Sequence, residues 1–131
     1  MKSAEFYKER LLEHYNHPRH TERLSKVDFA SEEFNHSCGD QVHIEGSIKD
    51  GKIEKVAFTG SGCVVSQAAA SMLMEECIGK TIFEVIGYDR YFIEHLIGVP
   101  MGPTRLRCAM LALYALQHGL KKYQDEQENR K

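Results

Sequence analysis

The segment VHIEGSIKDGKIEKVAFTG, residues 42–60, decides the fold class of this chain. Its first part alternates apolar and polar side chains, which places Val42, Ile44 and Ile48 on one face of a strand. The KDG that follows is a turn in which glycine adopts a positive φ at little cost, and the remaining residues return as a second strand. The segment therefore predicts an antiparallel hairpin with one buried face.

Helical patterns flank the hairpin on both sides. Ser3 is a suitable N-cap for a first helix that runs to about Tyr15 and is ended by Pro18. The connection at 17–37 shows little periodicity and has room for one short strand. The helices predicted after the hairpin cover residues 64–79, 80–88, 90–98 and 105–120, the last closed by Gly119 and followed by a charged tail, 121–131, that we expect to fray. The order predicts an α+β arrangement: a helix, a small antiparallel sheet, then a C-terminal group of helices.

The composition is that of one globular domain, which we expect to span residues 1–131. Of the 131 residues, 42% are hydrophobic and 27% are charged. A chain of this length and hydrophobic content can bury a core without disulfide or metal cross-links. A net charge of −2 argues against nucleic acid as the main partner. No apolar run approaches the roughly 20 residues of a membrane span, and no signal-peptide core is present. We therefore expect a cytoplasmic protein whose cysteines are metal-binding, catalytic or buried.

Three of the four cysteines lie beside predicted turns. Cys38 lies in NHSCGDQ, residues 35–41, with Asp40 two positions on. Cys63 follows TGSG and directly precedes a helix, and Cys108 is expected in the first turn of the last helix. Unpaired N–H groups and the helix dipole at such ends favour a thiolate and lower the pKa of the thiol. Cys63 and Cys108 are therefore candidates for reactive or metal-binding thiols.

Two arginines flank the last of these cysteines. Arg105 and Arg107 would favour a thiolate at Cys108, although basic residues in a first turn oppose the dipole by up to about 1 kcal/mol each. Residues that destabilise their own helix without an evident local benefit mark a place where function is expected. The alternative is that both arginines pair with distant acids such as Glu75 or Glu76.

Three soft thiols and one carboxylate make four donors, the number that zinc prefers, and the same set could hold an iron–sulfur cluster. The set is Cys38, Asp40, Cys63 and Cys108. No C-x-x-C pair occurs, so folding would have to assemble the site from three separate loops. Spacing by itself leaves open the alternative that these cysteines are buried small hydrophobes.

The remaining cysteine and the histidines indicate less. Cys77 falls on an apolar helix face, which predicts core packing. His36 is part of an H-x-C-x-D run and is either a competing ligand or a solvated turn residue. His14, His17 and His20 have no consistent partner spacing and are interpreted as lying on the surface or behind the ligands.

Four segments together resemble the iron–sulfur cluster scaffold family, the group that includes IscU, SufU and the N-terminal domain of NifU. They are SCGD around Cys38, TGSGCVVSQAAASML around Cys63, RLRCAML around Cys108 and the opening YKERLLEHYNHPRH. The resemblance runs in order from about Tyr7 to Leu120.

The resemblance implies an α+β domain with a three-stranded antiparallel sheet and an exposed metal or cluster site. It implies that the three motif cysteines receive persulfide sulfur from a cysteine desulfurase and, with Asp40, bind iron, a [2Fe–2S] cluster or zinc. Cys108 is the expected persulfide acceptor, Arg107 would favour its thiolate, and Asp40 would be the labile ligand. Apo iron–sulfur proteins or carrier proteins would receive the product.

The chain departs from each branch of the family. IscU-type scaffolds carry histidine immediately before the third cysteine, where this chain has Arg107. A basic residue at this place resembles SufU-like proteins instead. Arginine stays protonated and cannot be a ligand. SufU proteins, however, carry an extra segment between the second and third cysteines that is missing here, and the L-P-P-V-K run of IscU is replaced by MGPTR. The chain combines features of both branches.

Three functions follow. The first is a scaffold that accepts sulfur from a cysteine desulfurase and assembles a transient [2Fe–2S] cluster for transfer to apo-proteins. The second is a zinc-dependent sulfurtransferase that relays persulfide, and the third is a small zinc module in which the metal only supports folding. Whether the protein is an enzyme stays open between the first two.

Overall fold

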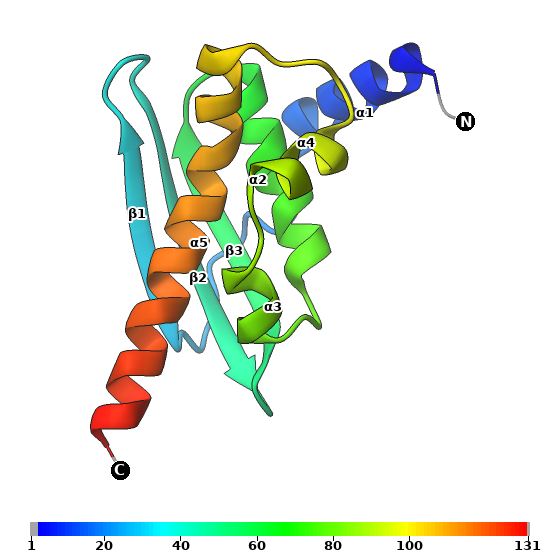
Figure 1. Ribbon diagram of the computed structural model, residues 1–131. Coiled ribbons are helices and arrows are strands. Elements are labelled where there is room, and N and C mark those ends of the chain that lie inside the picture. The colour runs from blue at the N-terminus through cyan, green and yellow to red at the C-terminus, as the bar shows by residue number, and fades with distance from the viewer. Residues whose placement is uncertain (1–2, 131) are drawn as a thin grey trace.

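The computed structural model describes residues 3–130 and has the α+β arrangement that the sequence predicted (Figure 1). The elements are α1 (Ala4–Asn16), β1 (Phe29–Asn35), β2 (Asp40–Lys49), β3 (Lys52–Ser61), α2 (Val64–Cys77), α3 (Ile82–Ile86), α4 (Arg90–Ile97) and α5 (Pro103–Asn129). The strands form one antiparallel sheet in the order β1-β2-β3. None of the helices within residues 3–130 has the length and apolar character that crossing a bilayer requires.

The predicted hairpin is β2 and β3, joined at Asp50 and Gly51, which both adopt positive φ. Val42 and Ile44 are buried on its inner face, as the alternation predicted, and Ile48 lies beyond a register shift on the same face. The short strand expected in the preceding connection is β1, which pairs along the outer edge of β2.

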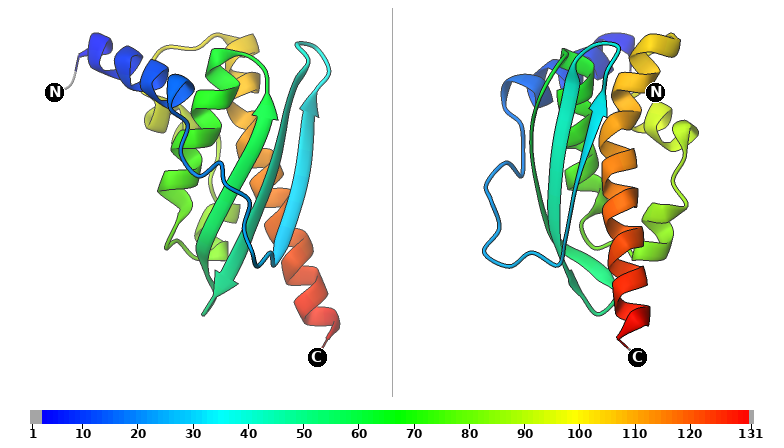
Figure 2. Two further views of the ribbon diagram at one scale, coloured as in Figure 1. Left: turned by 180° about the vertical axis from the view of Figure 1, so that it is seen from behind. Right: turned by 90° about the vertical axis from the view of Figure 1, so that its left-hand side faces the viewer.

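Helices α2 and α5 cover one face of the sheet, and α1, α3 and α4 pack around them (Figures 1 and 2). The apolar side chains between these layers form one cluster. Its most completely buried large members are Ile44, Ile53, Met72, Leu73, Met74, Val85, Ile93, Ile97, Leu113, Leu116 and Leu120.

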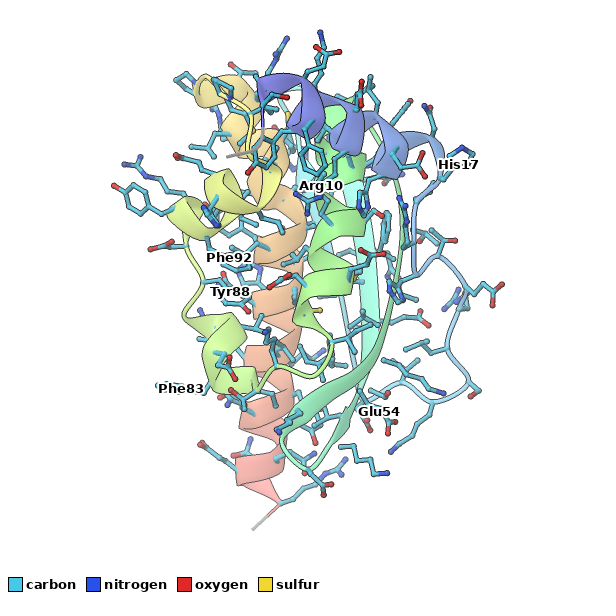
Figure 3. All side chains as sticks on the ribbon, turned by 90° about the vertical axis from the view of Figure 1, so that its right-hand side faces the viewer. Arg10, His17, Glu54, Phe83, Tyr88 and Phe92 are labelled. Carbon is cyan, nitrogen blue, oxygen red and sulfur yellow. The ribbon has the colours of Figure 1, made fainter. Side chains whose placement is uncertain are left out.

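Helix α1 is held across α2 and α4 by polar contacts as well as apolar ones. Arg10 donates to the carbonyl of Leu96 at the end of α4 (2.8 Å), beside the stacked rings of Tyr88 and Phe92 (Figure 3). His14, predicted to lie on the surface or behind the ligands, is instead buried between α1 and α2, and its Nδ1 lies 2.8 Å from Ser71 Oγ. Burial lowers the pKa of His14, so its neutral form is favoured.

Helix α5 does not end at Gly119, where the sequence predicted a helix end. A Cβ at this position would lie 3.0 Å from the Phe29 ring, so glycine lets the helix approach β1 closely. Leu120 is fully buried and Tyr123 packs against the core, so the helix still has apolar surface to cover. Residues 121–129, for which a frayed tail was predicted, are helical.

The segment between α1 and β1 crosses the opposite face of the sheet (Figure 2). It covers Glu45, an acidic side chain that is buried in the middle of β2. The carboxylate of Glu45 accepts the N–H of Leu24 at 2.9 Å and pairs with Arg23 and His43 at 3.3 and 3.2 Å. The hydrogen bond from Leu24 is the main reason that the pKa of Glu45 lies below its ordinary value.

Because the pKa of Glu45 is lower in the folded state, its contribution to stability is present at neutral pH and is lost as pH falls below the ordinary glutamate range. Glu45→Gln keeps an oxygen for Leu24 but loses the charge, so we expect it to lower the free energy of unfolding by about 1 kcal/mol at pH 7. Urea unfolding at pH 7 and pH 4 measures this, and the variant should lose less stability on acidification. Glu54→Gln, on the exposed side of β3, should behave as wild type. Equal acid sensitivity of Glu45→Gln and wild type would contradict the prediction.

Candidate metal centre

Three segments far apart in sequence meet at one end of the sheet (Figure 1). They are the turn between β1 and β2, the junction of β3 with α2, and the first turns of α5. Each contributes one of the predicted cysteines: Cys38, Cys63 and Cys108. Asp40, the first residue of β2, lies beneath them with 1% of its surface exposed.

The ligand atoms lie at distances that suit a tetrahedral metal ion. Cys38 Sγ is 3.1 Å from Asp40 Oδ2 and 3.5 Å from Cys108 Sγ. Zinc–sulfur bonds of about 2.3 Å and zinc–oxygen bonds of about 2.0 Å give tetrahedron edges of roughly 3.5–3.8 Å. Ligand atoms of these three residues all lie within 4.8 Å of one another. The donor set present therefore fits zinc or iron bound mainly through sulfur.

Cys63 is placed at the rim of this group. Its Sγ lies 3.6 Å from Asp40 Oδ2, but Cys63 is not among the residues whose ligand atoms all fall within 4.8 Å. As the N-cap of α2 its sulfur accepts the backbone N–H of Ser66 at 3.4 Å. Capping and metal binding therefore compete for the same sulfur.

Cys63→Ser should separate these two roles. Serine is a strong N-cap, so the metal-free variant should gain about 0.5–1 kcal/mol in free energy of unfolding. The loss of a soft donor should weaken zinc binding by roughly tenfold or more. Urea unfolding in chelator and competition titration of zinc measure the two effects. Ser3→Ala removes the equivalent cap of α1 and should leave zinc affinity unchanged. Wild-type zinc affinity in Cys63→Ser would remove Cys63 from the donor set.

The carboxylate of Asp40 is held ready to bind a cation. Burial alone would raise its pKa, but hydrogen bonds from the side chains of Cys38 and Cys108 and from the backbone N–H of Cys63 (2.9 Å) outweigh it, so the pKa is lowered. Asp40 therefore stays ionised, as a metal ligand requires.

The position and the burial of Cys108 differ from those predicted. Helix α5 begins at Pro103, which suits a first helical position, so Cys108 is its sixth residue and lies beyond the first turn. Its side chain is nearly buried, and this burial, with contacts to Asp40 and Cys38, raises the pKa of the thiol. The helix end does not by itself favour a thiolate here, so the proton must be released to a base when a cation binds or before the sulfur attacks an electrophile.

Arg105 and Arg107 are both exposed beside this helix end. Among residues 3–130 neither takes part in an ion pair, and Glu75 lies 3.7 Å from Arg19 instead. The alternative that both arginines pair with Glu75 or Glu76 is therefore wrong. The predicted effect of Arg107 on Cys108 stays a prediction.

The other candidates lie away from the donors. His36 is exposed and stacks on Phe34 at 6.2 Å, so it is the solvated turn residue rather than a competing ligand. Cys77 is fully buried in the core, as predicted, and burial raises its pKa to about 12.

Sequence reasoning missed the role of the two glycines in TGSGC. A Cβ on Gly60 would lie 2.4 Å from the carbonyl of Gln41, and a Cβ on Gly62 would lie 2.2 Å from Asp40 Oδ1. Both glycines are needed so that β3 can approach the start of β2. Their spacing on either side of Ser61, just before a candidate ligand, was the available signal.

The chain is similar to known proteins over most of its length. Residues 6–130 match the model of the NifU-like N-terminal domain family. An iron–sulfur cluster assembly scaffold protein IscU from Thermotoga maritima is 28% identical over 88% of this chain and 93% of its own length. A zinc-dependent sulfurtransferase SufU from Bacillus subtilis is 29% identical over 88% of this chain and 90% of its own.

A solved structure shows the same architecture. The crystal structure from Fervidobacterium islandicum, described as a candidate scaffold protein for the SUF system, is 26% identical and superposes with a TM-score of 0.73 over 91% of this chain and 99% of that one. An antiparallel sheet covered by helices, with a cysteine and aspartate cluster at one end, defines a class of small α+β domains with a candidate metal centre. Within that class, the chain belongs to the NifU-like N-terminal domain family.

Proposed function

We propose that this protein is an iron–sulfur cluster assembly scaffold that accepts sulfur from a cysteine desulfurase and assembles a transient [2Fe–2S] cluster for apo-proteins or carrier proteins. The observation that carries the proposal is the group of Cys38, Asp40 and Cys108 ligand atoms within 4.8 Å, with Cys63 at its rim. The relative from Thermotoga maritima, named as an iron–sulfur cluster assembly scaffold protein, supports the same function.

Each residue then has a distinct task. The Cys108 thiolate attacks the outer sulfur of the desulfurase persulfide, the sulfur–sulfur bond breaks, and the desulfurase cysteine leaves as a thiolate. Cys38 and Cys63 hold iron as soft ligands, and Asp40 is a hard, exchangeable ligand that eases release of the product. Two electrons from a reductant outside this chain convert each sulfane sulfur to sulfide.

The test is a visible absorption spectrum during anaerobic incubation with a cysteine desulfurase, cysteine and ferrous iron. Growth of sulfur-to-iron charge-transfer bands, lost in Cys63→Ser, is the expected result. A featureless spectrum, with zinc retained and a faster desulfurase, would replace the scaffold with the second candidate, a zinc-dependent sulfurtransferase. Arg107 and the relative from Bacillus subtilis favour this second candidate.

Removing the metal distinguishes the scaffold and the sulfurtransferase from a structural zinc module. The hydrophobic cluster spans the sheet and helices α1 to α5, and the donor atoms lie at one end of the sheet, so we expect the fold to persist without a bound metal. We expect the chelator-treated protein to keep its far-UV circular dichroism signal. It should still unfold cooperatively, but at a lower urea concentration, because a bound metal at 100 times its Kd contributes about 2.7 kcal/mol to the free energy of unfolding. Loss of helical signal on chelation would point to the structural module instead.

A further inference from the structure

The sulfur atoms of Cys63 and Cys108 are placed differently with respect to backbone donors. Cys63 caps α2, where free N–H groups are available, and its sulfur accepts the N–H of Ser66 at 3.4 Å. Cys108 is the sixth residue of α5, where the neighbouring N–H groups are already used inside the helix. A hydrogen bond to the sulfur of Cys108 must therefore come from a side chain.

Asn35, the last residue of β1, supplies that donor. Its Nδ2 lies 3.9 Å from Cys108 Sγ, at the long end for an N–H···S contact. Its Oδ1 accepts the backbone N–H of Ser37 at 3.1 Å. Because a backbone N–H can only donate, this second contact identifies the oxygen end of the amide and turns the N–H end toward Cys108.

Asn35 also closes the turn that carries Cys38. Its carbonyl accepts the N–H of Gly39 at 2.8 Å, and it pairs with Asp40 across the two strands. One residue therefore touches the turn of the first cysteine and the sulfur of the third.

We propose that Asn35 is a positioning residue of the metal centre: its side-chain N–H donates to the Cys108 sulfur, withdraws electron density from it and keeps it beside Cys38. The inference rests on the proposed function, since it concerns the same donor set. Hydrogen bonds to metal-bound sulfur tune the electronic properties of the metal, and partners of this kind contribute roughly 10–100-fold to metal affinity.

Two variants separate the side-chain N–H that Asn35 donates to Cys108 from its role in the turn. Asn35→Asp keeps the oxygen that caps Ser37 but replaces the N–H with a carboxylate oxygen. Asn35→Ser keeps a shorter capping oxygen and adds no charge, but it cannot reach Cys108. Glu33→Gln is the matched control, because Glu33 lies on the same face of β1 and pairs with His118 rather than with a cysteine.

The probe is Co²⁺ bound to the full chain, with its sulfur-to-cobalt charge-transfer band as the readout. Loss of the hydrogen bond makes the sulfur more electron-rich, so we expect the band to move to longer wavelength in Asn35→Ser and further in Asn35→Asp. Co²⁺ affinity should fall by roughly tenfold in Asn35→Ser, and Glu33→Gln should match wild type in both respects.

The outcomes are distinct. If wild type shows the sulfur-to-cobalt band and both Asn35 variants show it at the same wavelength, the role of Asn35 is overturned and the proposed function is left intact. An equal shift in Glu33→Gln would mean that the band reports strand distortion, which also overturns the role. A wild-type protein with no sulfur-to-cobalt band would remove the donor set itself, and both proposals with it.

Discussion

Gly62→Ala is expected to abolish tight metal binding, although residue 62 supplies no ligand. Gly62 adopts φ 152°, and a Cβ there would lie 2.2 Å from Asp40 Oδ1 and 2.8 Å from Ser66 Oγ. Asp40 cannot move aside freely, because it is buried and accepts the N–H of Cys63. We expect zinc affinity to fall at least roughly 100-fold and the free energy of unfolding to fall by about 2–4 kcal/mol. Competition titration with a zinc chelator and urea unfolding measure the two effects.

Two other glycines near the site provide the controls. Gly39 has a positive φ, but a Cβ there would meet nothing within 4 Å, so Gly39→Ala should cost only about 1 kcal/mol in backbone strain. Gly102, the N-cap of α5, has an ordinary φ of −74°, and a Cβ there would meet nothing within 4 Å, so Gly102→Ala should keep zinc affinity. Wild-type zinc affinity in Gly62→Ala would show that Asp40 is not a ligand.

Cys108→Ser is expected to abolish stable sulfur acceptance from a cysteine desulfurase. The serine hydroxyl is close in size to the thiol, so the packing at the start of α5 should persist. It cannot form the persulfide, however, because attack on sulfane sulfur requires a thiolate. Mass spectrometry of the protein after incubation with desulfurase and cysteine measures the added sulfur, which we expect only in proteins that keep Cys108.

Cys77→Ala is the control for the loss of a cysteine as such. Cys77 is fully buried in the core, where its raised pKa of about 12 keeps the thiol protonated and unreactive. The variant should accept sulfur as wild type does and lose about 1–2 kcal/mol of stability through the cavity. Persulfide found on Cys38 or Cys63 in Cys108→Ser would move the acceptor role to that residue.

The local pattern of the chain determined the fold class and most of its elements. Alternation in residues 42–60 predicted the central hairpin, because side chains on a strand point to opposite faces. Cys63 was correctly placed at the start of α2, because TGSG interrupts the alternation of the strand just before the helical pattern begins. The candidate donor set of three soft thiols and one hard carboxylate was likewise visible in residue types alone.

Only the tertiary structure decided how those donors are surrounded. The sequence predicted an accessible, acidic thiol at Cys108, but α5 starts earlier and the packed sheet buries the side chain. Gly119 was predicted as a helix end, but the contact with Phe29 makes it a point of close approach. The contact between Asn35 and Cys108 gave no sequence signal, because the two residues are 73 positions apart. Burial and hydrogen-bond partners depend on which distant segments pack together, and local sequence patterns do not encode that.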